Sequence, residues 1–326
     1  MIDPIIFSVQ VLGVTLTLRW YGVLVMFGTL AGSWLAEKEV RRRGENGEVI
    51  WDLLLWVLPA GIVGARLWYV ATASLGGNRD YLENPVQIFN IPQGGLHFFG
   101  GLLFGGLALL AFLKTRGLDP WLFLDAIAPA ALLGQALARP ANFINQELYG
   151  PPTRLPWGIP IEFEHRLEQY RDLSLYPEAS TRFHPTFAYE MIWNILVALL
   201  LLWFSRQFQK RIKPGAVFGG WLVLAGVGRV LIEFFRPDQP KIPGIDFTYS
   251  ALVAGLMAVA GALILLVRYE KVRLAAAEHW ATRYRISGTD GRPRGATVTG
   301  APADGRKRGS SARRRPRPGN QAKHSR

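Results

Sequence analysis

Residues 51–73, WDLLLWVLPAGIVGARLWYVATA, form an almost unbroken apolar run that carries one arginine, Arg66. The hydrocarbon core of a bilayer is about 30 Å thick, and a helix needs roughly 20 apolar residues to cross it. The run meets that length and therefore predicts a transmembrane helix. Six further runs have a similar character, at about 20–36, 95–113, 121–138, 186–204, 216–235 and 249–267.

The composition of the whole chain agrees with these runs. Half of the 326 residues are hydrophobic, and the mean hydropathy is +0.16. The apolar residues come in blocks, whereas the elements of a soluble domain would show a periodic apolar face. We therefore predict an all-α integral membrane protein with about seven transmembrane helices.

The loops are alternately rich and poor in lysine and arginine, and this alternation predicts the orientation in the membrane. The loops after the first, third and fifth runs are basic, with Lys38, Arg41, Arg42, Arg43, then Lys114, Arg116, then Arg206, Lys210, Arg211, Lys213. In the loops between them, Arg79 is the only basic residue of 74–94, and Lys241 is the only basic residue of 237–248. Because short basic loops stay in the cytoplasm, we expect the N-terminus outside and the C-terminus in the cytoplasm. A long loop, about 139–185, then lies on the outer side.

The two ends of the chain differ from the apolar region 18–268. Residues 5–18 partly alternate polar and apolar side chains around Gly13, which predicts a short hairpin or an interfacial segment within residues 1–17. No Lys or Arg precedes Arg19, so a cleavable signal peptide is not expected. Residues 269–326 are strongly basic, and from about 287 they are rich in Gly, Pro, Ser and Arg. We expect a mostly disordered cytoplasmic tail that touches anionic lipid.

Several site classes are not expected. The chain has no cysteine, and its five histidines form no HxxxH or HExxH pair, so we expect no metal and no cofactor. Aromatic residues are not interleaved with the basic residues after Tyr284, so no specific nucleic acid partner is expected.

Arginines within apolar runs are the first indication of function. A charge at the centre of a bilayer costs at least about 2.5–3.5 kcal/mol. Arg66, Arg139 and Arg229 all lie in or at the end of such runs. Snorkelling or an ion pair explains any one of them, and Glu233 is placed to pair with Arg229 at i+4. Arg236 follows at i+7, so we expect more positive than negative charge on this face, which favours an anionic ligand such as phosphate.

The segment 134–150, GQALARPANFINQELYG, is the second indication. Pro140 disfavours a continuous helix and suits the first turn of a new one, whose amides would face an anion beside Arg139. Asn142, Asn145 and Gln146 then follow an apolar run directly, where amides are costly unless they bind something. An ordinary outer loop rich in amides is the alternative.

The run Arg139-Pro-Ala-Asn142-Phe143-Ile-Asn145-Gln-Glu147-Leu-Tyr-Gly150 resembles the signature of the bacterial prolipoprotein diacylglyceryl transferases, roughly G-R-x-G-N-F-x-N-x-E-x-x-G. Other blocks agree in order and spacing. They are Arg19-Trp20-Tyr21-Gly22, Gly64-Ala65-Arg66-Leu67, Gly94-Gly95-Leu96 with Gly100-Gly101, Asp125 with Ala128-Pro129, Leu155-Pro156-Trp157-Gly158, His184-Pro185-Thr186 with Tyr189-Glu190, and Arg229 with Glu233-Phe234-Phe235-Arg236. The resemblance covers about residues 18–268 and leaves out the basic tail.

The resemblance implies an enzyme of the bacterial plasma membrane. That family moves the diacylglyceryl group of phosphatidylglycerol onto the lipobox cysteine thiol of a preprolipoprotein signal peptide, forming a thioether and releasing glycerol-1-phosphate. Its site faces the outer side of the membrane, as the loop charges predict for this chain. The alternatives are a transporter or flippase for an anionic lipid, a diverged inactive member, and a membrane scaffold.

The resemblance also implies roles for individual residues. Arg139 and Arg229 would clamp the phosphate, and Glu147 would orient an arginine or the glycerol hydroxyls. His97 is a candidate base on its own chemistry, because histidine can accept a proton at neutral pH, and an interfacial hydrogen-bonding role is the alternative. The predicted substrate-binding residues are Tyr21, Arg66, Asn142, Asn145, Gly150, Glu190, Glu233 and Arg236. His184 is expected to fix a loop.

This chain departs from the family at two proton carriers. Phe99 stands where the family has His or Tyr before Gly100-Gly101, and Ala225 stands where it often has Tyr. Ala138 and Ala141 also replace glycines of the signature. Either His97 substitutes as the base, or the arginines activate the thiol electrostatically. We expect His97 to support the reaction without being indispensable.

Overall fold

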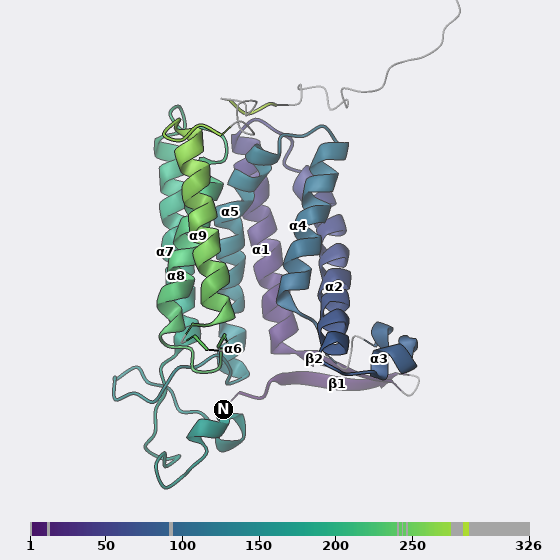
Figure 1. The fold of residues 1–326 in the computed structure, drawn as a ribbon, viewed down its shortest axis with the longest axis vertical. Coiled ribbons are helices and arrows are strands. Elements are labelled where there is room, and N and C mark those ends of the chain that lie inside the picture. Colours follow the sequence, from purple (N-terminus) through teal and green to yellow (C-terminus); the bar gives the residue numbers. More distant parts are fainter. Residues whose placement is uncertain are drawn as a thin grey trace, which may run out of the picture. The chain divides into compact units, whose positions relative to one another are not determined.

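A computed structural model describes residues 2–11, 14–90, 94–239, 241–242, 244–245, 247–274 and 283–286. Seven long helices run side by side (Figure 1): α1 (Trp20–Arg42), α2 (Val49–Leu75), α4 (Phe98–Thr115), α5 (Pro120–Ala138), α7 (Thr186–Gln207), α8 (Ala216–Glu233) and α9 (Tyr249–Arg268). The shorter elements are β1 (Ile5–Val11), β2 (Val14–Arg19), α3 (Asp80–Glu83), η1 (Pro85–Phe89), α6 (Pro140–Ile144), η2 (Phe163–His165) and η3 (Glu168–Tyr170).

Each predicted apolar run corresponds to one long helix. Within the described part of the chain, six helical segments are long and apolar enough to cross a membrane: α2, α4, α5 together with α6, α7, α8 and α9. The remaining run, 20–36, corresponds to α1, which has 23 residues and lies beside the others. The charged C-terminal half of α1 makes it less apolar. The structure therefore confirms a helical, multi-pass membrane architecture, and the crossing by α1 stays a prediction.

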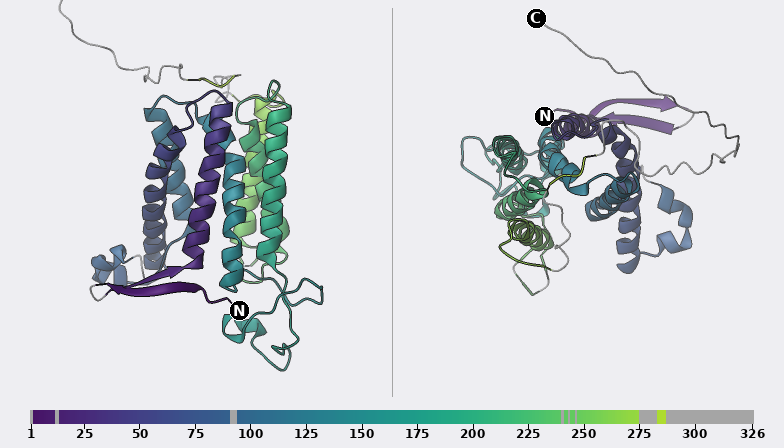
Figure 2. Two further views of the ribbon diagram at one scale, coloured as in Figure 1. Left: turned by 180° about the vertical axis from the view of Figure 1, so that it is seen from behind. Right: turned by 90° about the horizontal axis from the view of Figure 1, so that it is seen from above.

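The long helices form three neighbouring groups (Figures 1 and 2). Helices α2 and α4 pack as one pair, α1 and α5 as a second, and α7, α8 and α9 as a third group against α5. Glycines allow the α1–α5 backbones to approach closely, because a Cβ on Gly28 would collide with the carbonyl oxygen of Gly134. The α1–α5 pair thus forms the centre of the bundle.

The N-terminal segment is the hairpin that the alternation predicts. Strands β1 and β2 pair antiparallel, with Phe7 opposite Leu18 and Val9 opposite Leu16. The intervening pair, Ser8 and Thr17, is hydrogen-bonded through its hydroxyl groups at 3.1 Å on the other face. The hairpin is therefore apolar on one face and polar on the other, as a segment at a membrane surface requires.

The opposite end of the bundle is tied together by basic side chains. Glu39 of α1 is almost fully buried and pairs with Arg42 and Arg43 at 2.8 Å each and with Arg206 of α7 at 3.0 Å. Ser205 accepts a further hydrogen bond from Arg42 at 2.7 Å. These basic residues belong to the loops predicted to face the cytoplasm, whereas the hairpin, α3 and α6 lie at the other end (Figure 1).

Residues 283–286 dock against the basic end of the bundle. The Tyr284 hydroxyl donates to Asp125 Oδ2 at 2.7 Å, and the Arg285 amide donates to Asp119 at 2.8 Å. The fully buried Asp125 also accepts from the amides of Gly215 and Phe218. Burial raises the pKa of Tyr284 above its ordinary value, so this tyrosine remains a donor at neutral pH. The predicted disorder of the tail concerns residues 287–326, which lie outside the described residues.

Tyr284→Phe should destabilise the bundle. The change removes one of the donors to the buried Asp125 carboxylate, and a buried acceptor that loses a partner costs about 1–3 kcal/mol. We expect a lower midpoint of thermal unfolding in detergent, whereas Tyr269→Phe, at an exposed tyrosine, should leave the midpoint unchanged. Equal midpoints for the two variants would contradict a stabilising role of the Tyr284 hydroxyl.

Candidate functional site

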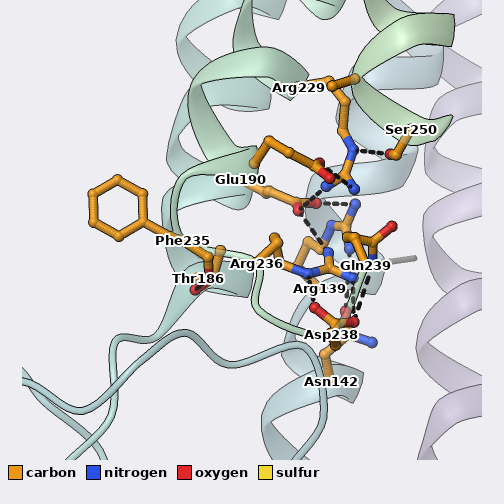
Figure 3. A network of polar contacts seen from close by, with 12 residues as sticks. Arg139, Asn142, Thr186, Glu190, Arg229, Phe235, Arg236, Asp238, Gln239 and Ser250 are labelled. Atoms are coloured by element: carbon orange, nitrogen blue, oxygen red, sulfur yellow. Dashed lines mark hydrogen bonds and ion pairs between the residues drawn. The ribbon is translucent and has the colours of Figure 1, made fainter. Parts of the chain in front are cut away.

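Three arginines converge on one carboxylate at the end of the bundle that carries α6 (Figure 3). Glu190, in the second turn of α7, forms an ion pair with Arg139, which joins α5 to α6. Its Oε1 atom lies 3.5 Å from Arg229 Nη1 of α8 and 3.3 Å from Arg236 Nη1. Only about 9% of Glu190 is exposed, so the four charges share a largely desolvated environment.

Two further carboxylates complete the cluster. Glu233 pairs with Arg229 at 2.8 Å and accepts a hydrogen bond from the Thr248 hydroxyl. Asp238 takes two hydrogen bonds from Arg236, at 2.8 Å and 2.9 Å. Burial alone would raise the pKa of Asp238, but its hydrogen bonds to the Arg236 guanidinium hold that pKa below the ordinary value. Asp238 therefore stays ionised at neutral pH.

The predicted excess of positive charge is wrong for this cluster. Among the described residues it contains three arginines and three carboxylates, because the fold adds Glu190 and Asp238 to the pair visible within α8. Arg66, which the sequence grouped with the other arginines, is not part of the cluster. The cluster is thus charge-balanced in the absence of a ligand.

A chain of hydrogen bonds runs from Arg139 to Glu147. Asn142 Oδ1 lies 3.5 Å from Arg139 Nη1, and Asn142 donates its amide hydrogen to Glu147 Oε1 at 2.8 Å. Asn145 donates to the same oxygen at 3.3 Å. Glu147 thus orients Arg139 indirectly, through the Asn142 amide.

The backbone around Glu147 is strained. Gln146 and Leu148, on either side of it, have φ angles of 53° and 56°, in the left-handed region that non-glycine residues rarely adopt. Hydrogen bonds between Gln146 and Glu162 hold this conformation, at 2.7 Å and 2.8 Å. Strain of this kind concentrates at functional sites, where the surrounding structure must stabilise it.

The break at Pro140 is confirmed, but its predicted contribution to anion binding is reduced. Helix α6 begins at Pro140 and has only five residues. A helix this short has little macrodipole, so its amides add little to the site. The charge at this position comes from the Arg139 side chain, which pairs with Glu190.

Gly150 has a packing role in this structure. A Cβ there would lie 2.7 Å from Thr186 Oγ1, 2.8 Å from the Phe235 carbonyl oxygen and 2.9 Å from His184 Cβ. The Gly150 amide also donates to the His184 carbonyl at 2.8 Å. Gly150 therefore allows the outer loop to approach α7 and the end of α8, and its predicted contact with substrate stays a prediction.

Arg66 organises a loop in this structure. Its guanidinium donates to the carbonyl oxygens of Gln87, Ile88, Gly94 and Gly95, at 2.6–3.1 Å. These contacts fasten η1 and the segment before α4 to α2. Its predicted role in substrate binding stays a prediction, and four of its five N–H donors bond to backbone carbonyls.

Tyr21 and His97 lie outside the arginine cluster. Tyr21 is exposed in the first turn of α1, a helix that contacts α6. His97 directly precedes α4, its ring stacks on Phe99 at 5.7 Å, and its buried Nδ1 atom has no hydrogen-bond partner among the described residues. His184 bonds to the Tyr189 hydroxyl at 2.9 Å, in agreement with the predicted loop-fixing role.

Asp238, Thr248 and Ser250 are site residues that the sequence analysis missed. The Ser250 hydroxyl accepts a hydrogen bond from Arg229 Nε at 2.7 Å. For Thr248 the sequence did hold a signal: it stands directly before an apolar run, and a threonine at that position is expected to cap the helix. Asp238 lies two residues after Arg236, a spacing that also permits local pairing.

The fold and the site define a multi-pass membrane protein with a buried arginine–carboxylate cluster at one end of its helices. The chain belongs to the prolipoprotein diacylglyceryl transferase family, whose family model matches residues 4–267. The match includes every residue of the cluster and excludes the basic tail.

Curated relatives agree with this assignment. A phosphatidylglycerol–prolipoprotein diacylglyceryl transferase of Chloroflexus aggregans is 35% identical over 278 residues, which is 81% of this chain and 90% of the relative. An enzyme of the same name from Enterococcus faecalis is 37% identical over 251 residues, covering 76% of this chain and 86% of the relative. One from Leifsonia xyli is 33% identical over 259 residues, covering 78% and 75%.

Proposed function

We propose that this chain transfers the diacylglyceryl group of phosphatidylglycerol to the lipobox cysteine thiol of preprolipoproteins. The observation that carries the proposal is the convergence of Arg139, Arg229 and Arg236 on a single carboxylate. An arrangement that holds one carboxylate between three guanidiniums also suits the phosphate of a lipid headgroup, because both anions accept several charge-assisted hydrogen bonds. Family membership supplies the identity of the two substrates.

The reaction places specific demands on the site. The thiol sulfur attacks the glycerol carbon that bears the phosphate, a C–S bond forms, and the C–O bond to phosphate breaks. The bonding electrons leave with the phosphate oxygen, so glycerol-1-phosphate departs, and the thiol proton passes to an acceptor. The site must therefore stabilise charge that develops on the leaving phosphate, which fixed guanidinium donors do effectively in a desolvated environment.

The exposure of the arginines suggests how they divide this task. The side chains of Arg139 and Arg229 are 24% and 25% exposed, so both can reach a ligand. Arg236 is 7% exposed and is held by Asp238, which suits it to setting the local charge. Asn142, and Asn145 beside it, would position the headgroup.

An apolar groove next to the site supports a lipid substrate. The groove has a volume of about 380 Å³ and lies between α1, α2, α4 and α5. It extends from Ile50 and Ala36 to Gln135 and Ala138, and Ala138 directly precedes Arg139. An acyl chain in the groove would end beside Ala138, one residue before Arg139.

The proposed location is the bacterial plasma membrane, with the site towards the outer face. The basic ends of α1 and α7 lie opposite the arginine cluster, and the positive-inside rule assigns such an end to the cytoplasm. The amphipathic hairpin would then rest on the outer membrane surface. A cysteine-labelling experiment at Ser174 and Gln209 tests this, because Ser174 should react from outside intact cells and Gln209 only after permeabilisation.

His97→Ala should slow transfer by less than about 10²-fold, the lower limit of what a well-placed general base contributes. The reason is that His97, which directly precedes α4, donates its amide to Ala65 of α2 and makes no described contact with the arginine cluster. Phe99→His, which restores the residue expected in the family, should keep or raise the rate. The measurement is initial rate against pH, and complete loss in His97→Ala at every pH would make His97 indispensable.

The decisive test of the function is transfer in vitro. The purified chain is reconstituted with phosphatidylglycerol and a lipobox peptide, and thioether formation is followed by mass. We expect a product heavier by one diacylglyceryl group, together with glycerol-1-phosphate. No product under conditions where the Chloroflexus aggregans relative is active would refute the proposal, and movement of labelled lipid across the bilayer without product would indicate a flippase.

A further inference from the structure

Glu190 differs from the other carboxylates of the cluster in its contacts. It is the one acid among the described residues that contacts all three arginines, and it is the only acid paired with Arg139. Its position between the guanidiniums is where a bound anion would receive the most donors. An anionic ligand and the Glu190 carboxylate therefore require the same place.

The charges of the cluster match this competition. Without Glu190, the three arginines face Glu233 and Asp238 alone, which leaves one positive charge unbalanced. A phosphodiester carries a single negative charge. Because unpaired charges are strongly disfavoured in a desolvated site, the cluster requires one additional anion, and either Glu190 or the phosphodiester supplies it.

The contacts also indicate that Glu190 is the acid that can leave. Glu233 is held by the Thr248 hydroxyl and by an i+4 ion pair, and Asp238 by two hydrogen bonds from Arg236 and one from Gln239. Glu190 meets Arg229 and Arg236 only at 3.5 Å and 3.3 Å, and the arginines are its only hydrogen-bond donors among the described residues. The departure of Glu190 would therefore break fewer short hydrogen bonds than the departure of Glu233 or Asp238.

We propose that Glu190 is a displaceable counter-ion that occupies the phosphate position in the ligand-free protein and leaves it when an anionic headgroup binds. The identification of that anion as a lipid phosphodiester rests on the proposed function. Competition by Glu190 weakens anion binding, keeps the arginines ordered before substrate arrives, and favours release of the phosphate product. Glu190 thus sets the affinity of the site.

Glu190→Gln tests the proposal through binding. The substitution keeps the shape of the side chain but removes the competing charge, so glycerol-1-phosphate should bind about tenfold more tightly than to the wild type. The thermal midpoint of the variant should also rise more steeply with added glycerol-1-phosphate. Equal or weaker binding would overturn the proposal, because it would mean that Glu190 only holds the arginines in place.

Glu233→Gln is the matched control. It adds the same net charge but leaves Glu190 in position, so we expect a gain in affinity clearly smaller than in Glu190→Gln. Equal gains would overturn the proposal in favour of a general charge effect.

If Glu190→Gln does not fold, Glu190→Asp replaces it, because a carboxylate one methylene shorter cannot reach all three arginines. That variant should bind about two- to threefold more tightly, and unchanged or weaker binding overturns the proposal.

Binding and transfer are measured separately so that the two proposals can fail independently. Tighter anion binding in Glu190→Gln with no transfer by the wild type would refute the proposed function and still support Glu190 as a displaceable counter-ion. Transfer by the wild type without tighter binding in the variant would refute the counter-ion role of Glu190 and still support the proposed function.

Discussion

Replacing Arg139 with glutamine should slow diacylglyceryl transfer by about 10²–10³-fold, the loss seen when one preorganised donor to a developing negative charge is removed. Arg139 is partly exposed, and Glu190 is its only carboxylate partner among the residues that the structure describes, so its guanidinium is the one most readily transferred to a ligand. The loss should appear mainly in kcat, because the charge on the leaving phosphate increases in the transition state. The measurement is steady-state transfer to a lipobox peptide.

Two controls separate catalysis from folding. Arg139→Lys keeps the charge but lacks the planar fork, so it should recover only part of the activity. Arg171→Gln removes an outer-loop arginine whose ion pair with Glu168 is exposed, and it should leave transfer unchanged. Full activity in Arg139→Gln would show that this arginine does not stabilise the leaving group. If the protein were a non-catalytic membrane scaffold, none of these substitutions would change any measured effect on lipid.

The second large effect is expected from Gly150→Ala. The added methyl group would lie within 3 Å of Thr186, Phe235 and His184, and two of these contacts are with oxygen atoms. Overpacking of this kind typically costs about 1–3 kcal/mol. The same displacement would shift the start of α7, which carries Glu190, and therefore the arginine cluster. We expect a lower thermal midpoint together with a loss of transfer.

Gly106→Ala is the matched control for this change. Gly106 lies within α4, and a Cβ there would meet no atom within 4 Å. Alanine is favoured over glycine in a helix by about 1 kcal/mol, so the control should be neutral or slightly stabilising. A normal midpoint and normal transfer in Gly150→Ala would contradict the packing role inferred for Gly150.

The sequence predicted the helices accurately because its apolar runs are long and separated. The run 51–73 corresponds to α2 and the run 249–267 to α9, each within two residues at both ends. Pro140 predicted the end of α5 for a local reason, since proline cannot continue the preceding helix without losing a hydrogen bond. The alternation in residues 5–18 predicted the hairpin for the same kind of local reason.

The candidate site was only partly predictable. Arg229 and Glu233 are four residues apart on one helix, so their pairing follows from the helical period. Glu190 is 39 residues from Arg229 and 46 from Arg236, and no local rule relates them. Grouping Arg66 with Arg139 and Arg229 was wrong, although all three have the same sequence context, an arginine in or at the end of an apolar run. The fold brings Arg139 and Arg229 together on Glu190, whereas Arg66 bonds to the backbone of residues 87–95.

The sequence by itself determined that this chain is a helical membrane protein and which family signature it carries. Hydrophobic length and local turn chemistry act within a few residues, so they can be read along the chain. Only the tertiary structure decided which charges meet. The packing of α5, α7 and α8 places Glu190 between three arginines, and the end of α8 adds Asp238. The arginine-rich face expected from the sequence is therefore a balanced cluster, because burying these arginines without ligand requires an equal number of carboxylates nearby.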